Sequence, residues 1–195
     1  CEKPPATKLS DLDGLESYPD DLVLAYGFNH RLHDSIMTIK EMVDSNEMGN
    51  ILWMRGRYGK EVDDTYKDSW RCDKELNGGG ILIDQGIHLL DIMDWVAGGF
   101  DVTQAILSDT FIEIEGVEDN AFVNLYSSAT KVTASLHSTI TQWRYLFSLE
   151  IFLEKGSLVL NGLRTSSGRY GEEILAIRPL TPDGQFEDQE LNYST

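Results

Sequence analysis

Asp84 and His88 lie four positions apart within the stretch "GGGILIDQGIHLLD", residues 78–91. Residues four apart on an α-helix lie one above the other, so these two side chains would share one face. Leucine and isoleucine occupy most of the other positions, so we expect a largely buried helix. A carboxylate beside an imidazole fixes its tautomer and raises its basicity. The pair is therefore a candidate general acid–base system that works near neutral pH.

The same residues allow other interpretations. A buried Asp–His pair is as compatible with a structural hydrogen bond as with catalysis. A metal site would use Asp84, His88 and Asp91, but the sequence offers no clear further histidine or cysteine ligand, so no metal is expected. The glycines at 78–80 leave space for a ligand beside the backbone. Backbone N–H groups at the start of a helix also suit an anionic or polar ligand.

The elements that must position these residues follow from hydrophobic periodicity. We expect strands over 21–29, 50–59, 131–140 and 172–179, two more within 146–162 around a turn at Lys155-Gly156, and helices over 34–45 and about 81–97. Helices cluster early and strands dominate late. The predicted fold class is therefore α+β, with a large, open, mainly antiparallel sheet and helices on one face. His30 and Arg31 end the first expected strand and are pocket candidates, whereas His33 is expected on the surface.

Composition excludes several classes of function. The 195 residues include 16 Lys and Arg against 33 Asp and Glu, a net charge of −17, which repels nucleic acid and anionic membranes. No apolar run approaches the roughly 20 residues of a membrane helix. Two cysteines, Cys1 and Cys72, exclude a disulfide scaffold and fit a reducing, cytoplasmic compartment. The sequence contains no glycine-rich phosphate-binding fingerprint.

The order of several motifs resembles the Gfo/Idh/MocA family of NAD(P)-dependent oxidoreductases. The resemblance covers nearly the whole chain and rests on "EKP" (2–4), "GFNHR" (27–31), "GGGILIDQGIHLLD" (78–91), "VEDNAF" (117–122) and "LFSLEI" (146–151). The stretches "SWRCDKELNGGG" (69–80) and "LHSTITQWRYLFSLEI" (136–151), with "VEDNAF", look most like members associated with surface-polysaccharide and nucleotide-sugar metabolism.

The resemblance implies a two-domain organisation in which a Rossmann domain binds the dinucleotide. Residues 1–20 would be the end of that domain and its linker, with most of the domain outside this chain. Residues 21–195 would form the domain for substrate binding and oligomerisation. NAD or NADP would be bound mainly by the other domain, so we expect this fragment alone to be inactive.

The same resemblance assigns the reaction and its residues. Hydride would pass between nicotinamide and a secondary alcohol of a sugar, sugar nucleotide or polyol. Lys3 matches the catalytic lysine of the family, and Asp84 and His88 match its Asp-x-x-x-His pair. His88, oriented by Asp84, would take the hydroxyl proton while Lys3 stabilises the alkoxide. The positions expected at the cofactor are Glu2, Lys3, Pro4, Asn29 and His30.

Sugar pockets favour aromatic faces flanked by hydrogen-bonding groups. The candidates for substrate binding are Arg31, Tyr66, Trp70, Arg71, Trp143 and Tyr145, and the aromatic ones can equally pack at a sheet edge. Arg71 suits a carboxylate or phosphate on the substrate. His137 is expected at a subunit interface, in a homodimer or homotetramer built through the sheet. The alternative function is a non-catalytic sugar-binding or assembly module of the same fold.

Overall fold

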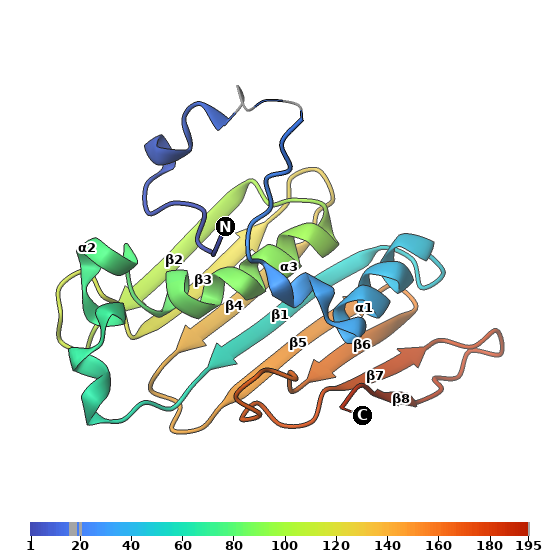
Figure 1. Ribbon diagram of the computed structural model, residues 1–195. Coiled ribbons are helices and arrows are strands. Elements are labelled where there is room, and N and C mark those ends of the chain that lie inside the picture. Colours follow the sequence, from blue (N-terminus) through green and yellow to red (C-terminus); the bar gives the residue numbers. More distant parts are fainter. Residues whose placement is uncertain (16–18, 20, 195) are drawn as a thin grey trace.

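The central feature of the fold is an eight-stranded sheet with the order β2-β3-β4-β1-β5-β6-β7-β8 (Figure 1). The structure is a computed structural model that describes residues 1–15, 19 and 21–194. Its strands are β1 (Ile51–Gly59), β2 (Val102–Ser108), β3 (Asn120–Tyr126), β4 (Thr133–Thr139), β5 (Leu146–Leu153), β6 (Gly156–Asn161), β7 (Ile174–Pro179) and β8 (Gln189–Asn192). Strands β1 and β4 run parallel, and the other described neighbours are antiparallel. The predicted open, mainly antiparallel sheet is confirmed.

The two longer helices, α1 (Asp34–Ser45) and α3 (Ile87–Ala97), lie side by side over one face of this sheet (Figure 1). The short helix α2 (Lys74–Asn77) lies beyond one end of α3. Asn46 caps the C-terminal end of α1 and Gly98 caps that of α3, and both residues adopt the left-handed conformation that commonly closes a helix. The α+β class with helices on one face therefore holds.

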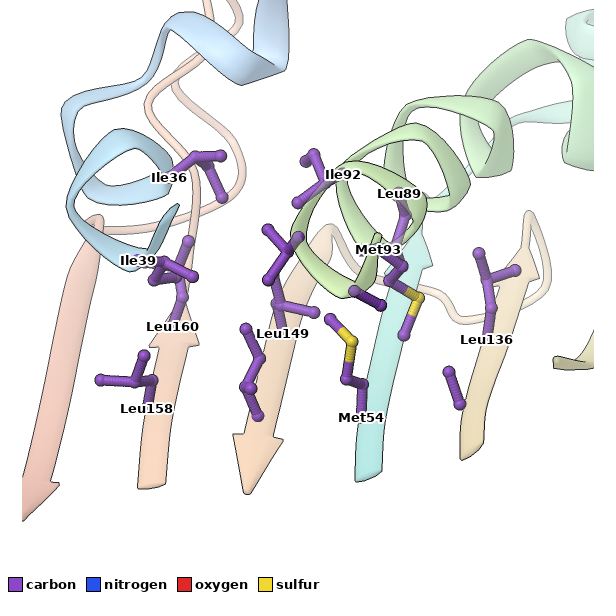
Figure 2. Packing of buried hydrophobic residues seen from close by; sticks show 14 of the residues in the cluster. Ile36, Ile39, Met54, Leu89, Ile92, Met93, Leu136, Leu149, Leu158 and Leu160 are labelled. Carbon is purple, nitrogen blue, oxygen red and sulfur yellow. The ribbon is translucent and has the colours of Figure 1, made fainter. Parts of the chain in front are cut away.

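The core lies between these helices and the middle of the sheet. Figure 2 shows Ile36 and Ile39 of α1 beside Leu160, and Leu89 of α3 above the central strands. Leu89 packs directly on β1 at Gly56, where an added Cβ would lie 2.7 Å from the Leu89 side chain. The glycine thus lets α3 approach the sheet closely, which fixes the helix that carries His88.

Alternation along the strands separates the two faces of the sheet. In β4, Ala134 and Leu136 are buried under the helices, whereas Thr133 is exposed and Ser135 and His137 are partly exposed on the other face. This is the pattern of a sheet with one face packed on the core.

Two expected elements differ from the structure. Residues 21–29 form no strand in the described part of the chain, because their β-forming side chains have no partner strand; Val23 is 97% exposed. The turn between β5 and β6 lies at Glu154-Lys155, one position earlier than predicted, since Gly156 already pairs with Leu153. In residues 1–15, 19 and 21–194, no helix is long and apolar enough to cross a membrane.

Candidate active site

The helix predicted over 81–97 consists of two parts, a π-helical turn (Leu82–Gly86) followed by α3. At the start of this turn, the carboxylate of Glu118 accepts hydrogen bonds from the backbone N–H groups of Gly80 at 2.8 Å and Leu82 at 2.9 Å. Two of the N–H groups that the sequence offers to a ligand are therefore bound by a side chain of the protein itself. π-Helical turns inside α-helices are frequent at functional sites.

Asp84 lies in this turn and faces three cations. Its carboxylate oxygens lie 2.8 Å from Lys60 Nζ, 3.4 Å from Arg71 Nε and 3.6 Å from Lys3 Nζ. Lys3 also donates a hydrogen bond to the main-chain oxygen of Asp84. Burial alone would raise the pKa of Asp84, but the neighbouring cations, above all Lys60, hold it below its ordinary value. The carboxylate of Asp84 therefore holds three basic side chains close together.

The expected hydrogen bond between Asp84 and His88 is not formed. Within the described residues, Nδ1 of His88 is buried and has no hydrogen-bond partner. The π-helical turn explains the difference, because its wider i→i+5 spacing rotates Asp84 away from the residue four positions on. The tautomer of His88 is thus not set by Asp84.

His88 stacks instead on His30, with ring centroids 3.9 Å apart and planes inclined by 12°. His30 is fixed by Tyr58, whose hydroxyl lies 2.9 Å from Nε2, and by Asn29 at 3.1 Å from Nδ1. Burial, with Lys3 as the next cause, lowers the pKa of His88 to about 4, and burial and the His88 ring lower that of His30 to about 2. Both imidazoles are neutral near pH 7.

A cavity of about 820 Å³ opens over Asp84 and His88. It is lined by four of the six residues expected at the substrate, namely Tyr66, Arg71, Trp143 and Tyr145. The backbone of Trp143, which lines the cavity, has a φ of 55°, an uncommon conformation for a bulky residue. Its ring packs edge-on against Phe111, with centroids 5.2 Å apart.

A second cavity, of about 440 Å³, adjoins the first. It is lined by Glu2, Lys3, Asn29 and His30, four of the five residues expected at the cofactor. Pro4 is not among its lining residues. Lys3, His88, Thr165 and Ser166 line both cavities. These residues therefore lie where a ligand in one cavity would meet a ligand in the other.

Two expected substrate residues do not line either of these cavities. Arg31 forms a two-point ion pair with Asp91 of α3, with Nε to Oδ2 at 2.7 Å, and its guanidinium lies over the ring of Trp95. Trp70 is 52% exposed and carries the guanidinium of Arg71 above its ring. Because Asp91 is engaged by Arg31, it is not available to ligate a metal with His88. In residues 1–15, 19 and 21–194, no group of three or more His, Cys, Asp or Glu side chains could hold a metal ion.

His33 was expected on the surface. The structure leaves its side chain only 16% exposed, with Nδ1 2.9 Å from a carboxylate oxygen of Glu173.

Sequence reasoning missed several cavity residues. Lys60 is 8% exposed and directly follows the last residue of β1. Its burial is not predicted from the sequence, because a lysine just after a strand is usually a surface residue. Tyr170 and Arg169 come from the polar segment 164–171 between β6 and β7, which carried no periodic signal. The hydroxyl of Tyr170 donates to Gln85 Oε1 at 3.2 Å, and burial raises the pKa of Tyr170 to about 12.

Comparison with known proteins places the chain in a family. Residues 36–159 match the model of the GFO/IDH/MocA C-terminal domain, which is more than half of the chain. The chain belongs to the GFO/IDH/MocA family. The resemblance stated from its motifs is thereby confirmed.

Several curated relatives in this family are sugar dehydrogenases. D-glucoside 3-dehydrogenase of Escherichia coli is 33% identical over 118 residues, which are 58% of this chain and 32% of the relative. Levoglucosan dehydrogenase of Pseudarthrobacter phenanthrenivorans is 30% identical over 112 residues, 55% of this chain and 29% of the relative. Glucose-6-phosphate 3-dehydrogenase of Bacillus subtilis is 28% identical over 153 residues, 68% of this chain and 44% of the relative. The matched regions span less than half of each relative.

Solved structures share the fold. Levoglucosan dehydrogenase in complex with NADH and levoglucosan superposes with a TM-score of 0.82 at 22% identity, over 98% of this chain and 54% of that chain. An oxidoreductase domain protein from Kribbella flavida gives a TM-score of 0.81 at 19% identity, over 100% of this chain and 55% of that chain. At these identities the likeness concerns the fold.

Proposed function

We propose that this chain is the substrate domain of an NAD(P)-dependent dehydrogenase that oxidises a secondary alcohol of a sugar, sugar nucleotide or polyol. The observation that carries the proposal is the position of Lys3 and His88, which line both cavities. Hydride transfer needs a substrate carbon and a cofactor ring in contact, with a proton acceptor beside the reacting hydroxyl. The relatives named as sugar dehydrogenases support this proposal.

The smaller cavity fits the reactive end of a dinucleotide. Its polar lining includes Asn29, Glu2 and Lys3, and the stacked rings of His30 and His88 add two neutral imidazoles. The buried Nδ1 of His88, which has no partner in the described part of the chain, leaves one hydrogen-bonding position for a bound group. NAD or NADP bound there would supply the acceptor for hydride. These residues would hold its nicotinamide end, and the other domain would hold the rest.

The side chains of this chain would handle the proton and the charge. Neutral His88 would accept the hydroxyl proton of the alcohol, and in the reductive direction would return it. The ammonium group of Lys3 would stabilise the developing alkoxide. Asp84 would hold Lys3 by its main-chain oxygen and carboxylate, so that the ammonium group is preorganised.

The larger cavity would hold the sugar. Tyr66, Trp143 and Tyr145 offer aromatic faces of the kind that sugar pockets use. The same cavity argues against the alternative of a non-catalytic module, in which Asp84 and His88 would be sealed from solvent. The resemblance to polysaccharide-associated and nucleotide-sugar members extends the proposal to substrates of that class.

The domain division follows from the same proposal. Residues 1–20 would be the end of the dinucleotide-binding domain and its linker, and residues 21–195 the substrate domain. The two parts contact each other, since Lys3 reaches Asp84 and the amino group of Cys1 donates to the main-chain oxygen of Ala25.

The face of the sheet opposite the helices is the proposed surface for a homodimer or homotetramer. Trp53 is 38% exposed there and stacks on Phe152 at 4.1 Å, and Phe122 is 51% exposed and stacks on His137 at 4.0 Å. Exposed aromatic clusters of this kind are enriched at interfaces between proteins.

A substrate screen tests the proposed function. The full-length protein would be incubated with NAD or NADP and with sugars, inositols and UDP-sugars while nicotinamide absorbance is recorded. We expect turnover in the wild type and a loss of about 100-fold or more in kcat for His88→Ala. Arg178→Gln, at a residue that lines neither cavity and pairs with Asp188, is the control and should keep wild-type turnover. Equal turnover in wild type and His88→Ala would disprove the assignment of His88.

A further inference from the structure

The larger cavity has an unusual charge for a protein of net charge −17. Its lining includes four basic side chains, Lys3, Lys60, Arg71 and Arg169. The cations at Asp84 share that single carboxylate, so their cluster is net positive. Most of the surface would repel an anion, and this cavity would attract one.

The acidic side chains at the cavity offset only part of this charge. Glu61 and Asp63 also line it, and like Arg169 both residues are exposed, where water and salt screen their charges. Asp63 is further engaged by the backbone N–H of Thr65 at 3.0 Å and by its hydroxyl. Lys60, in contrast, is 8% exposed, so water screens its charge little. The interior of the cavity therefore favours a ligand that brings negative charge.

Arg169 supplies a directional group for such a ligand. Its Nη1 donates to the hydroxyl of Tyr145 at 3.1 Å, and its guanidinium lies 5.2 Å from the centre of the Tyr145 ring. These contacts position the guanidinium at the cavity. Among the described residues Arg169 has no acidic partner within ion-pair distance. Arg71, which the sequence suggested for this role, is already within 3.4 Å of Asp84.

Hydroxyl groups lie on the same segment as Arg169. Ser167 lines the larger cavity and Thr165 and Ser166 line both cavities, and the hydroxyls of Thr165 and Ser167 lie 2.9 Å apart. A guanidinium with neighbouring hydroxyls is a common set of donors for a phosphate or carboxylate.

We propose that the substrate of the larger cavity carries a phosphate or carboxylate, bound by Arg169 and the hydroxyls of residues 165–167. The inference rests on the proposed function in one respect, because the bound molecule is taken to be the sugar that the dehydrogenase oxidises. The reacting hydroxyl of this anionic sugar lies at Lys3 and His88, and its anionic group lies toward Arg169.

Chemical protection tests the anion site without relying on activity. The full-length protein would be treated with phenylglyoxal, which modifies arginine, and the modification of each arginine measured by peptide mass spectrometry. We expect glucose 6-phosphate or glucuronate to slow the modification of Arg169 at least fivefold, and glucose to leave it unchanged. The internal control is Arg178 of β7, which pairs with Asp188 and does not line the cavity. Unchanged modification of Arg169 with every anionic sugar at millimolar concentration would overturn the proposal.

Kinetics with matched substrates separates the sources of the anion. In the wild type we expect kcat/KM for the phosphorylated or carboxylated sugar to exceed that for glucose at least tenfold, and the better of the two identifies the group. Arg169→Gln should raise KM for the anionic sugar at least tenfold with little change in kcat, Arg169→Lys should raise it less, and Arg178→Gln should not raise it. Equal kcat/KM for neutral and anionic sugars would overturn the proposal and leave the dehydrogenase intact. Protection of Arg169 without turnover of any sugar would support the anion site and contradict the proposed function.

Discussion

Lys60 and Asp84 form a buried ion pair, with Nζ 2.8 Å from Oδ2 and side chains that are 10% and 8% exposed. Their positions are set by different elements, since Lys60 follows the end of β1 and Asp84 lies in the π-helical turn before α3. The pair directs the carboxylate toward the cations of the larger cavity and leaves His88 to stack on His30. Asp84 therefore makes its ion pairs with Lys3 and Lys60 and no hydrogen bond to the imidazole of His88.

Replacing Lys60 by methionine should destabilise the fold. The substitution keeps an unbranched side chain but leaves the Asp84 carboxylate with Lys3 and Arg71 as its remaining cations. Removing one partner of a buried ion pair costs up to about 3–5 kcal/mol, and we expect about 2 kcal/mol here because two cations remain. Urea unfolding at pH 7 measures the change.

A double-mutant cycle isolates the pair. Asp84→Asn and Lys60→Met should be strongly non-additive, with a coupling free energy of about 1–3 kcal/mol. Additive effects would show that Lys60 and Asp84 do not interact in solution.

Stability should fall as the pH drops through the acid range. Burial lowers the pKa of His88 from 6.5 to about 4, so between these pH values the unfolded chain binds more protons than the folded one. The neutral ring is fully compatible with the fold above about pH 6.5, and stability is lost toward pH 4. We expect a loss of roughly 2 kcal/mol from this residue, after allowance for solvent that reaches the ring through the cavity.

Denaturant unfolding at pH 7 and pH 4.5 measures this loss. His88→Asn should lose less stability between the two pH values than the wild type. His137→Asn, on the opposite face of the sheet, should retain most of the loss. A pH dependence that is identical in wild type and His88→Asn would show that the ring is not buried in its neutral form.

Gly80 should not tolerate a side chain. A Cβ at this position would overlap the backbone of Glu118, which also accepts a hydrogen bond from Ile81 N–H at 2.9 Å. Gly80→Ala would therefore displace the start of the π-helical turn, at a cost of about 1–3 kcal/mol. At Gly79 the nearest atom to an added Cβ is Ile83 Cγ2 at 3.3 Å, so Gly79→Ala is the matched control. Melting temperatures of the two variants should differ clearly, and equal values would contradict the close packing of Gly80 on Glu118.

The face of the sheet opposite the helices should form the contact between subunits. Phe122→Glu places a charge beside the Phe122–His137 stack and should lower the molar mass of the full-length protein in light scattering. Trp70→Glu introduces the same charge at an exposed aromatic residue beside α2 and should leave the mass unchanged. A mass that is unaffected by Phe122→Glu would move the interface elsewhere or exclude it.

Periodicity accounts for what the sequence could predict. The alternation of Ala134 and Leu136 with Thr133 and Ser135 identified a half-buried strand, and the apolar positions around His88 identified a buried helix. These signals are local, because each depends on a repeat within one segment. The same logic failed at Val23, where strand-forming residues have no neighbouring strand.

Long-range contacts account for what could not be predicted. The partner of Asp84 is Lys60, which the fold brings across from the end of β1, and no spacing rule links these two positions. The rule that residues four apart face each other holds for an α-helix, whereas Asp84 lies in a π-helical turn. Arg169 was missed because its position at the cavity depends on Tyr145, which lies on another segment.

In the proposed reaction, hydride leaves a sugar carbon in the larger cavity and His88 accepts the hydroxyl proton. The most direct test measures the mass of the reduced cofactor that the full-length protein forms from NAD and a sugar deuterated on its carbons, either glucose or glucose 6-phosphate. We predict that the wild type transfers one deuterium to the nicotinamide and that His88→Asn does so at least about 100-fold more slowly. Reduced cofactor without deuterium would contradict hydride transfer from a sugar carbon, and equal rates in the two proteins would contradict the role of His88 as proton acceptor.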